Sequence, residues 1–319
     1  MNDRVSASQQ IAAYLCIFTS ILGGLTVSAQ SIVLSRELNI QAVIVFRMGF
    51  GALLAYLAMR MMKIKWQSRF DRSLLSRSLT SAVASQAIYF SIINLPIAMS
   101  TCLFHSTPVW TAILGWFFVG IAVRSVAKAA IGICILGVLL TTTPSGGGDL
   151  LGVAAGLIGA VLMSCLVLLT SKLRQVSAFQ IIIQASLFST ATAAVILIAQ
   201  GDALPSLLRL MSNRALIVAL AITATVGAFS QLIVIYAMKV LDPTIVSTIK
   251  LVEIPLALLF GSLFFQTEYD FKSILGAGLI LVGSSLLAIY SLPLVPVRYV
   301  RRQLTAEPGN IEQSVINVR

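Results

Sequence analysis

The sequence predicts an all-α integral membrane protein with ten transmembrane helices arranged in two inverted five-helix repeats. Composition is the first observation behind this prediction, because 58% of the 319 residues are hydrophobic and only 10% are charged, whereas about a quarter of a soluble domain is charged. The second is the recurrence of apolar runs of about 20 residues, the length at which a helix crosses a hydrocarbon core of about 30 Å. The third is a proline-bearing stretch that occurs twice.

The duplication is visible as identical residues at one constant offset. The second copy lies 147 residues after the first, and the identities fall at polar or helix-interrupting positions. The matches are Tyr89 with Tyr236, Pro96 with Pro243, Ser100 and Thr101 with Ser247 and Thr248, and Pro108 with Pro255. Identities this numerous at one offset indicate an internal repeat.

Ten segments have the length and composition of membrane-spanning helices. Five lie within 10–143, the first predicted repeat, and five within 150–291, the second; 1–9 is a predicted cytoplasmic N-terminus and 292–319 a cytoplasmic, disordered tail. Because each repeat holds an odd number of spans, the two copies must cross the membrane in opposite directions, as in many secondary transporters. The predicted spans are 10–31, 39–60, 76–95, 97–120, 126–143, 150–171, 178–199, 213–237, 243–265 and 273–291.

The distribution of Lys and Arg predicts the orientation in the membrane. With a cytoplasmic N-terminus, sixteen of the 22 Lys and Arg residues fall in cytoplasmic segments and four on the opposite side, namely Arg36, Arg209, Arg214 and Lys272. This bias predicts that both termini are cytoplasmic. The first span, Ile11–Gln30, could instead be a signal peptide, but it is longer than the 7–15 apolar residues of a signal core.

Neither the net charge of +11 nor the four cysteines indicates a separate function. The basic residues lie in loops and termini, which indicates membrane topology rather than nucleic-acid binding. Cys16, Cys102, Cys134 and Cys165 lie in apolar spans without metal-ligand spacing, so we expect packing residues, no metal site and no cofactor.

Four ionisable side chains lie deep within predicted spans, near the membrane midplane: Arg47, His105, Lys250 and Glu253. An unpaired charge at that depth costs at least about 2.5–3.5 kcal/mol, so such residues normally face a cavity and one another. Lys250 and Glu253 are spaced i, i+3 on one helix face and could form a salt bridge. With a neutral histidine, this group carries a net positive charge, which favours an anionic or zwitterionic substrate.

Structural roles for these four residues are the alternative. Lys250 and Glu253 could pair only to fix their helix. Arg47 could bind a backbone carbonyl or extend to the membrane surface, and His105 could make a hydrogen bond within the bundle.

Other polar features of the spans could also contribute. Pro108 and Pro255 are expected to kink the fourth and ninth spans beside the ionisable residues, because proline removes a helix hydrogen bond. Buried phenols and amides need partners in a membrane, so each is more often a helix contact than a ligand. They are Gln86, Tyr89, Gln180, Gln184, Gln231 and Tyr236.

These motifs resemble those of the EamA-type ten-helix permeases of the drug/metabolite transporter superfamily, over roughly residues 10–291. Pro96 and Pro243 precede the fourth and ninth spans, and segments 108–115 and 253–261 are similar to parts of those spans in the family. One departure is that the family often ends both spans with an acidic residue, whereas 118–124 has none. The resemblance implies a central cavity lined by spans three, four, eight and nine, with these residues at or near it: Tyr89, His105, Tyr236, Lys250 and Glu253.

We therefore expect a secondary active transporter of a small polar metabolite, an amino acid or a related carboxylate, in a bacterial inner membrane. Export or exchange of drugs, metabolites or nucleotide derivatives is the alternative. A membrane enzyme or receptor is a distant one, because no nucleophile–base set is visible. The expected partners are substrate, membrane lipid and a proton as coupling ion, with no nucleic acid. The candidates for substrate binding are Arg47, Tyr89, His105, Tyr236, Lys250 and Glu253, of which Glu253 is also the candidate for proton coupling.

Overall fold

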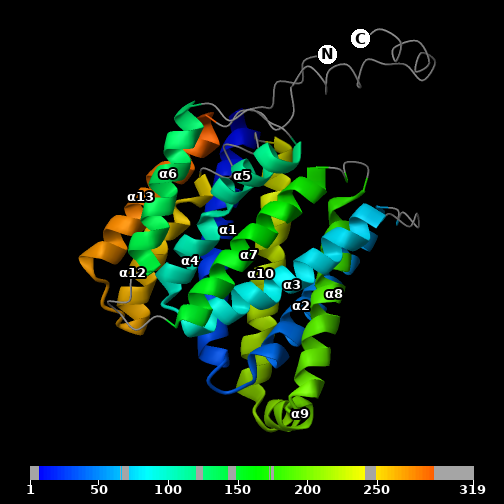
Figure 1. Ribbon diagram of the computed structural model, residues 1–319. Coiled ribbons are helices and arrows are strands. Elements are labelled where there is room, and N and C mark those ends of the chain that lie inside the picture. The colour runs from blue at the N-terminus through cyan, green and yellow to red at the C-terminus, as the bar shows by residue number, and fades with distance from the viewer. Residues whose placement is uncertain are drawn as a thin grey trace, which may run out of the picture.

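The computed structural model describes residues 7–64, 66, 72–119, 125–142, 149–171, 173, 176–240 and 249–290. All secondary structure in these ranges is helical, and the helices pack into one bundle (Figure 1). The first helix begins and the last one ends at the same end of that bundle. The helices are α1 (Ala7–Leu34), α2 (Ile40–Met61), α3 (Arg72–Asn94), α4 (Ile97–His105), α5 (Thr107–Val119), α6 (Ser125–Thr142), α7 (Leu150–Ser171), α8 (Ala178–Ala199), α9 (Ala203–Ser212), α10 (Arg214–Val240), α12 (Glu253–Phe265) and α13 (Phe271–Tyr290).

Six segments of the described chain are long and apolar enough to cross a membrane. They correspond to the predicted first, second, fourth, sixth, seventh and eighth spans, and shorter apolar helices occupy the fifth, ninth and tenth. The third predicted span corresponds to α3, whose serines lower its mean hydropathy. The all-α, multi-pass membrane class is thus confirmed, whereas ten spans in two inverted repeats stay a prediction.

The fourth predicted span is not one kinked helix, as the sequence led us to expect. It is divided at Ser106, with α4 ending at His105 and α5 beginning at Thr107. In the ninth span α12 begins at Glu253, directly after a turn at 251–252. Pro108 and Pro255 thus lie in first helical turns, where backbone N–H groups lack intrahelical partners and the missing proline N–H costs nothing. The prolines begin new helices instead of kinking old ones.

Helix boundaries recur along the chain at an almost constant interval. The helices α5 and α12 are both 13 residues long and begin 146 residues apart, at Thr107 and Glu253. The helices α6 and α13 also begin 146 residues apart, at Ser125 and Phe271. The sequence offset of 147 is therefore reproduced in the structure to within one residue.

Helix packing is also regular across the two halves of the chain. The helix α2 packs on α8, α6 on α13 and α4 on α12, while α1 packs on α10 and α3 on α7. If α1, α2, α3 and α6 are exchanged with α7, α8, α10 and α13, the pairs α2–α8 and α6–α13 become themselves, and the pair α1–α10 becomes α7–α3. The bundle is thus built mainly from contacts between the halves.

Glycines allow the closest of these contacts. A Cβ added to Gly137 of α6 would lie 2.7 Å from the carbonyl oxygen of Gly276 in α13, and the reverse holds for Gly276. On α7, Gly156 lies against Ser91 of α3 in the same way. Such close backbone approach favours helix association where lipid supplies no hydrophobic driving force.

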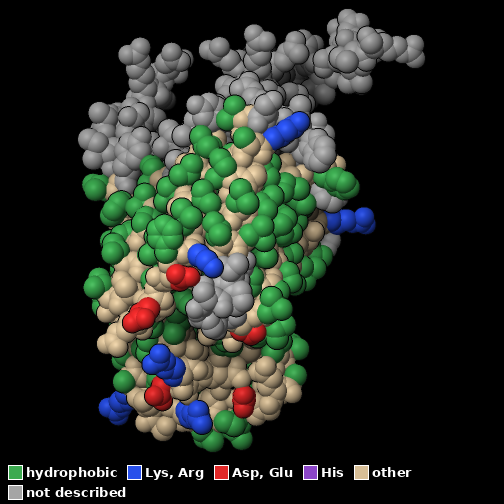
Figure 2. Space-filling view, turned by 60° about the vertical axis from the view of Figure 1, so that its left-hand side comes forward, with side chains coloured by type: hydrophobic (Ala, Val, Ile, Leu, Met, Phe, Trp, Pro, Cys, Tyr) green, Lys and Arg blue, Asp and Glu red, His purple; other side chains and the backbone are tan. Residues whose placement is uncertain are grey.

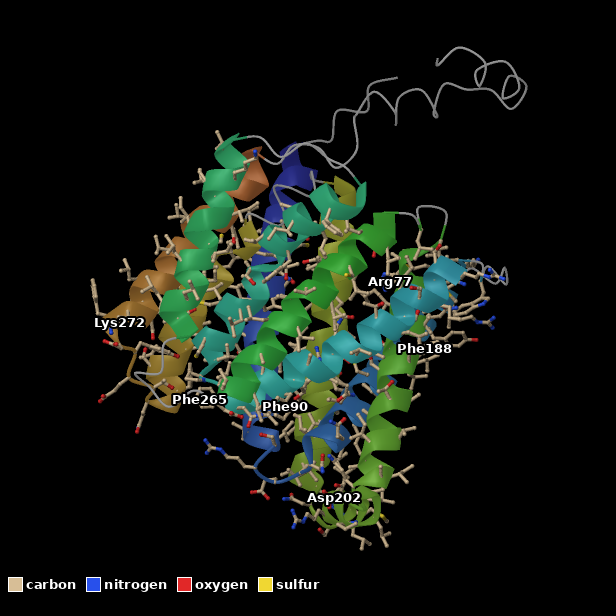
Figure 3. All side chains as sticks on the ribbon, in the orientation of Figure 1. Arg77, Phe90, Phe188, Asp202, Phe265 and Lys272 are labelled. Carbon is tan, nitrogen blue, oxygen red and sulfur yellow. The ribbon has the colours of Figure 1, made fainter. Side chains whose placement is uncertain are left out.

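The outer surface has the character of a membrane protein. On the face shown in Figure 2, apolar side chains cover the middle and charged ones gather toward one end. The short amphipathic helix α9 lies at one end, beside Asp202 (Figure 3). Asn39 Nδ2 ties α2 to α9 by donating a hydrogen bond to Asp202 Oδ2 at 2.6 Å.

Candidate functional site

Arg47 lies within the apolar helix α2, which places its positively charged side chain inside the bundle. Its Nη1 donates a hydrogen bond to the hydroxyl of Tyr89 on α3, and its Cζ lies 5.5 Å from the centre of the Tyr89 ring. Tyr89 itself is buried. The Nε of Arg47 is buried and has no hydrogen-bond partner among the described residues. The guanidinium is therefore held on one side by Tyr89 and left unpaired at Nε.

Gly227 of α10 contacts the opposite edge of this guanidinium. A Cβ at that position would lie 2.9 Å from both Nε and Nη2 of Arg47. Glycine therefore allows the guanidinium to pack directly against the backbone of α10. A side chain at this position would collide with the guanidinium.

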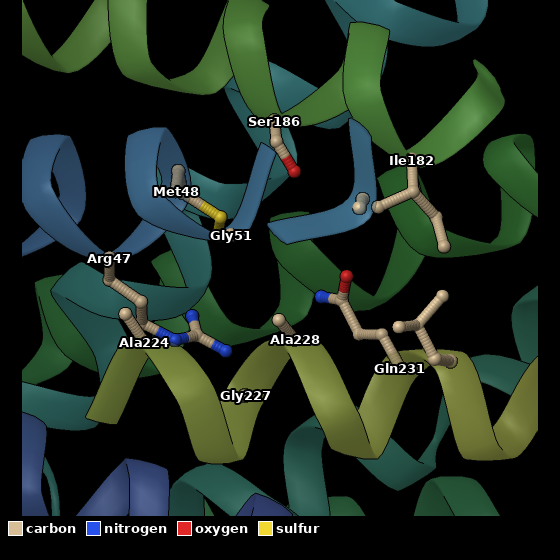
Figure 4. A pocket seen from close by; sticks show the side chains of 11 residues that line it. Arg47, Met48, Gly51, Ile182, Ser186, Ala224, Gly227, Ala228 and Gln231 are labelled. Atoms are coloured by element: carbon tan, nitrogen blue, oxygen red, sulfur yellow. The ribbon is translucent and has the colours of Figure 1, made fainter. Parts of the chain in front are cut away.

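A pocket opens around Arg47 between three helices (Figure 4). The guanidinium lies along α10 above Gly227, and the Gln231 amide points toward it from one turn further along the same helix. Ser186 of α8 points into the space from the other side. The remaining lining residues are small or apolar: Met48, Gly51, Ala55, Ile182, Ala224, Ala228 and Leu232. Polar groups thus converge from separate helices on a small apolar space of about 10 Å³, which has room for about one water molecule.

A second polar centre lies where the two interrupted spans meet. Nε2 of His105 lies 3.2 Å from Oε2 of Glu253, and the two side chains are only 8% and 12% exposed. His105 is in the last turn of α4 and Glu253 in the first turn of α12. The partial negative charge at a helix C-terminus stabilises an imidazolium, and the partial positive charge at an N-terminus stabilises a carboxylate. Both helix ends therefore favour the charged pair.

Hydroxyl groups satisfy the backbone that the interruption exposes. Phe104 loses a helical partner because Pro108 has no N–H, and Thr107 Oγ1 instead donates to its carbonyl oxygen at 2.5 Å. Ser284 Oγ of α13 donates to the carbonyl oxygen of His105 at 3.2 Å. The carbonyl groups of Phe104 and His105 at the break in span four thus have hydrogen-bond partners, as backbone groups within a membrane require.

Gly24 of α1 closes the second centre from the side opposite His105. A Cβ added there would lie 3.1 Å from Oε1 of Glu253. The neighbouring Gly23 meets Ser230 of α10, one turn from Gly227. The helices α1 and α10 therefore connect the two polar centres through contacts at adjacent glycines.

Comparison with known proteins gives a family match in the second half of the chain. Residues 150–289 match the model of the EamA-like transporter family. This match supports membership of the drug/metabolite transporter superfamily. A solved structure entitled "Crystal structure of protein" is 14% identical, covers 92% of this chain and 99% of that chain, and superposes with a TM-score of 0.59, which shows a shared fold. No curated protein sequence matches the chain significantly.

The structure brings two pairs of the candidate residues together. His105 and Glu253 come together, as do Arg47 and Tyr89. The structure shows no salt bridge between Lys250 and Glu253, although both residues are described, and the carboxylate pairs with His105. The i, i+3 spacing does not bring the two charges within salt-bridge distance, because a turn at 251–252 separates Lys250 from the helix that begins at Glu253. The side chain of Tyr236 lies outside the described residues.

The pocket also differs from the cavity that the family resemblance implied. Its described lining comes from α2, α8 and α10, the predicted second, seventh and eighth spans. Of the expected spans only the eighth lines it, and Tyr89, His105 and Glu253 of the third, fourth and ninth spans are not among its described lining residues. Among the described residues there is no cluster of three or more His, Cys, Asp or Glu side chains suited to a metal ion.

Sequence reasoning missed the glycines of both centres. Gly24 and Gly227 carry no chemistry of their own, and the significance of each depends on a side chain from another helix. A mid-helix glycine in an apolar span is the available signal, but it also marks ordinary helix packing. Gln231 was recognised as a polar residue, without any indication that it faces Arg47.

Proposed function

We propose that this protein is a secondary active transporter of a small polar metabolite, working by alternating access in a bacterial inner membrane with both termini in the cytoplasm. The two halves then act as inverted repeats, which the exchange of helix pairs and the recurring helix boundaries support. In transporters of this plan the substrate and coupling ion bind where discontinuous helices meet near the midplane.

The observation that carries the proposal is the His105–Glu253 pair between α4 and α12. It joins one interrupted span of each repeat, so its state affects how the two halves fit together. A proton on Glu253 removes the negative charge that attracts His105 and so weakens the contact between α4 and α12. Proton uptake and release by Glu253 would thereby couple the gradient to the movement of the repeats.

Arg47 holds the anionic part of the substrate in this scheme, with Tyr89 positioning its guanidinium. His105 changes from a substrate ligand to the partner of the coupling carboxylate. Lys250 and Tyr236 stay predicted contributors to binding. Exchange or export of drugs or nucleotide derivatives is the second candidate, favoured by the breadth of substrates in the superfamily that the sequence resembles.

Transport by purified protein in liposomes tests the proposal. We expect protein-dependent uptake of a compound from a radiolabelled panel of amino acids, carboxylates, nucleotides and cationic drugs, and accumulation when a pH gradient is imposed. Glu253→Gln keeps the side-chain size but takes up no proton, so accumulation should be lost while exchange of internal for external substrate persists.

Two results would contradict this proposal. Unchanged accumulation by Glu253→Gln would remove the coupling role of this carboxylate. Absence of both uptake and exchange across the panel, in liposomes that contain folded wild-type protein, would remove the transport function itself.

A further inference from the structure

The connection between α12 and α13 returns a tyrosine, Tyr269, to the bundle. This connection, 266–270, lies at the end of the bundle opposite to the one where α1 begins, which is the proposed outer side (Figure 1). Gln266 ends α12 in the left-handed conformation, with φ at 50°, and the N–H group of Thr267 then donates to the carbonyl oxygen of Gly261 at 3.1 Å. A left-handed residue after a helix reverses the direction of the chain. The reversal brings Tyr269 back alongside α12.

The side chain of Tyr269 lies at the contact between α12 and α4. A Cβ added to Gly261 would coincide with the Tyr269 hydroxyl and would lie 3.2 Å from Cγ2 of Ile97 in α4. Glycine at 261 is therefore required for the ring to lie there. The ring also packs against a buried cluster drawn from α1, α4 and α12: Ile17, Ile21, Leu25, Ala98 and Ala257. Tyr269 thus belongs to the second predicted repeat and packs among residues of the first.

The face of α12 beneath Tyr269 leads to the ion pair. Glu253, Ala257 and Gly261 are spaced i, i+4 and i+8, which places them along one side of the helix. Ala257 is completely buried between the carboxylate and the ring. At a rise of about 1.5 Å per residue, Gly261 lies about 12 Å along the helix from Glu253. Tyr269 therefore covers the end of the contact between α4 and α12 that has Glu253 at its inner end.

We propose that Tyr269 is a movable closure of this contact. Alternating access requires the two repeats to separate at each side of the membrane in turn. Because Tyr269 bridges the repeats, its ring must withdraw before water reaches Glu253 from this end. The connection that carries it is short and non-helical, so the ring can withdraw without unfolding a helix. The inference rests on the proposed transport function and adds the side chain that controls access to the coupling carboxylate from one side.

Two native cysteines allow the closure to be tested. Cys102 of α4 is 1% exposed and packs against Ile254 of α12, within the covered contact. Cys134 of α6 is equally buried in a cluster that does not include Tyr269. The purified full-length protein in detergent is treated with a charged methanethiosulfonate, which reaches thiols only through water, and mass spectrometry follows each cysteine. We expect Tyr269→Ala to speed labelling of Cys102 at least about tenfold, because labelling of a buried thiol follows the population of the open form. Cys134 should keep its wild-type rate.

The glycine beneath the ring provides a second test with a built-in rescue. Gly261→Ala places a methyl group where the Tyr269 hydroxyl lies, so it should displace the ring and speed labelling of Cys102. Tyr269→Phe keeps the ring and should leave labelling slow. Combined with Gly261→Ala, it removes the colliding hydroxyl and should restore slow labelling. The matched control is Gly278→Ala, because no described atom lies within 4 Å of the added methyl group.

Several outcomes would overturn the inference. One is unchanged labelling, in folded Tyr269→Ala, of both Cys102 and a second reporter introduced by Ala257→Cys. Another is equal acceleration at Cys134, which would show a general loosening of the bundle. If Tyr269→Ala fails to fold, equal labelling of Gly261→Ala with and without Tyr269→Phe would overturn it as well. Labelling needs no substrate, so these outcomes leave the proposed transport function intact, and failure of transport in liposomes leaves the labelling result unchanged.

Discussion

Arg47 illustrates how a single charge is accommodated within an apolar helix. An unpaired arginine at this depth is costly, and Tyr89 offsets part of that cost with a hydrogen bond and its ring face. The Nε of this guanidinium has no hydrogen-bond partner among the described residues. A fully satisfied arginine would serve only to hold helices together.

Removing the Tyr89 hydroxyl should therefore destabilise the protein. We expect Tyr89→Phe to lower the free energy of unfolding by about 1–3 kcal/mol, because it leaves a buried charged donor without its acceptor. Tyr56→Phe on α2 is the control, because Tyr56 is exposed and should change stability by less than about 0.5 kcal/mol. Denaturant or thermal unfolding in detergent measures both, and equal effects would show that the Tyr89–Arg47 bond contributes little.

For single residues, the sequence was a better guide to which side chains are candidates for the site than to which partners they contact. Intramembrane charge is so costly that Arg47, His105, Lys250 and Glu253 stand out in an apolar chain. Their partners depend on tertiary structure: His105 and Glu253 are 148 residues apart, whereas Lys250 looked like the partner of Glu253 only if the helix continued through both. The contact that decides the site is between repeats, where helical periodicity gives no information.

Among the helices, the breaks in the fourth and ninth spans determine the position of the His105–Glu253 pair more than helix length does. The sequence located the prolines and the repeat offset correctly, but it suggested kinks because a proline in a long apolar run has that effect in an unbroken helix. The structure uses Thr107 and Ser284 to complete the backbone bonding at the break. Ending one helix at His105 and beginning another at Glu253 aligns two helix dipoles with one ion pair.

The crossing of α6 and α13 offers a test of close helix packing with a control on the same helix. Gly137→Ala would bring a methyl group within 2.7 Å of the Gly276 carbonyl oxygen, whereas Gly132→Ala meets no described atom within 4 Å. We expect the first to destabilise the protein by about 1–3 kcal/mol through overpacking, and the second to be neutral or to stabilise it by up to about 1 kcal/mol. Equal unfolding free energies for the two variants would contradict the close contact.

In the whole molecule, the candidate site residues form two separate polar centres. The sequence predicted one cluster of ionisable residues that handles both substrate and proton. The structure instead contains an Arg47 pocket between α2, α8 and α10 and a His105–Glu253 pair between α4 and α12, linked through α1 and α10. The match to a transporter family indicates transport but does not specify the transported substrate.

The most direct test of this separation is to measure exchange and pH-gradient-driven accumulation of one radiolabelled substrate in the same liposomes for Arg47→Lys and Glu253→Gln. We expect Arg47→Lys to lose both activities, because substrate no longer binds, and Glu253→Gln to lose accumulation but retain exchange. If both variants lost the two activities in the same proportion, or if Arg47→Lys kept both, the assignment of substrate to one centre and proton to the other would be contradicted.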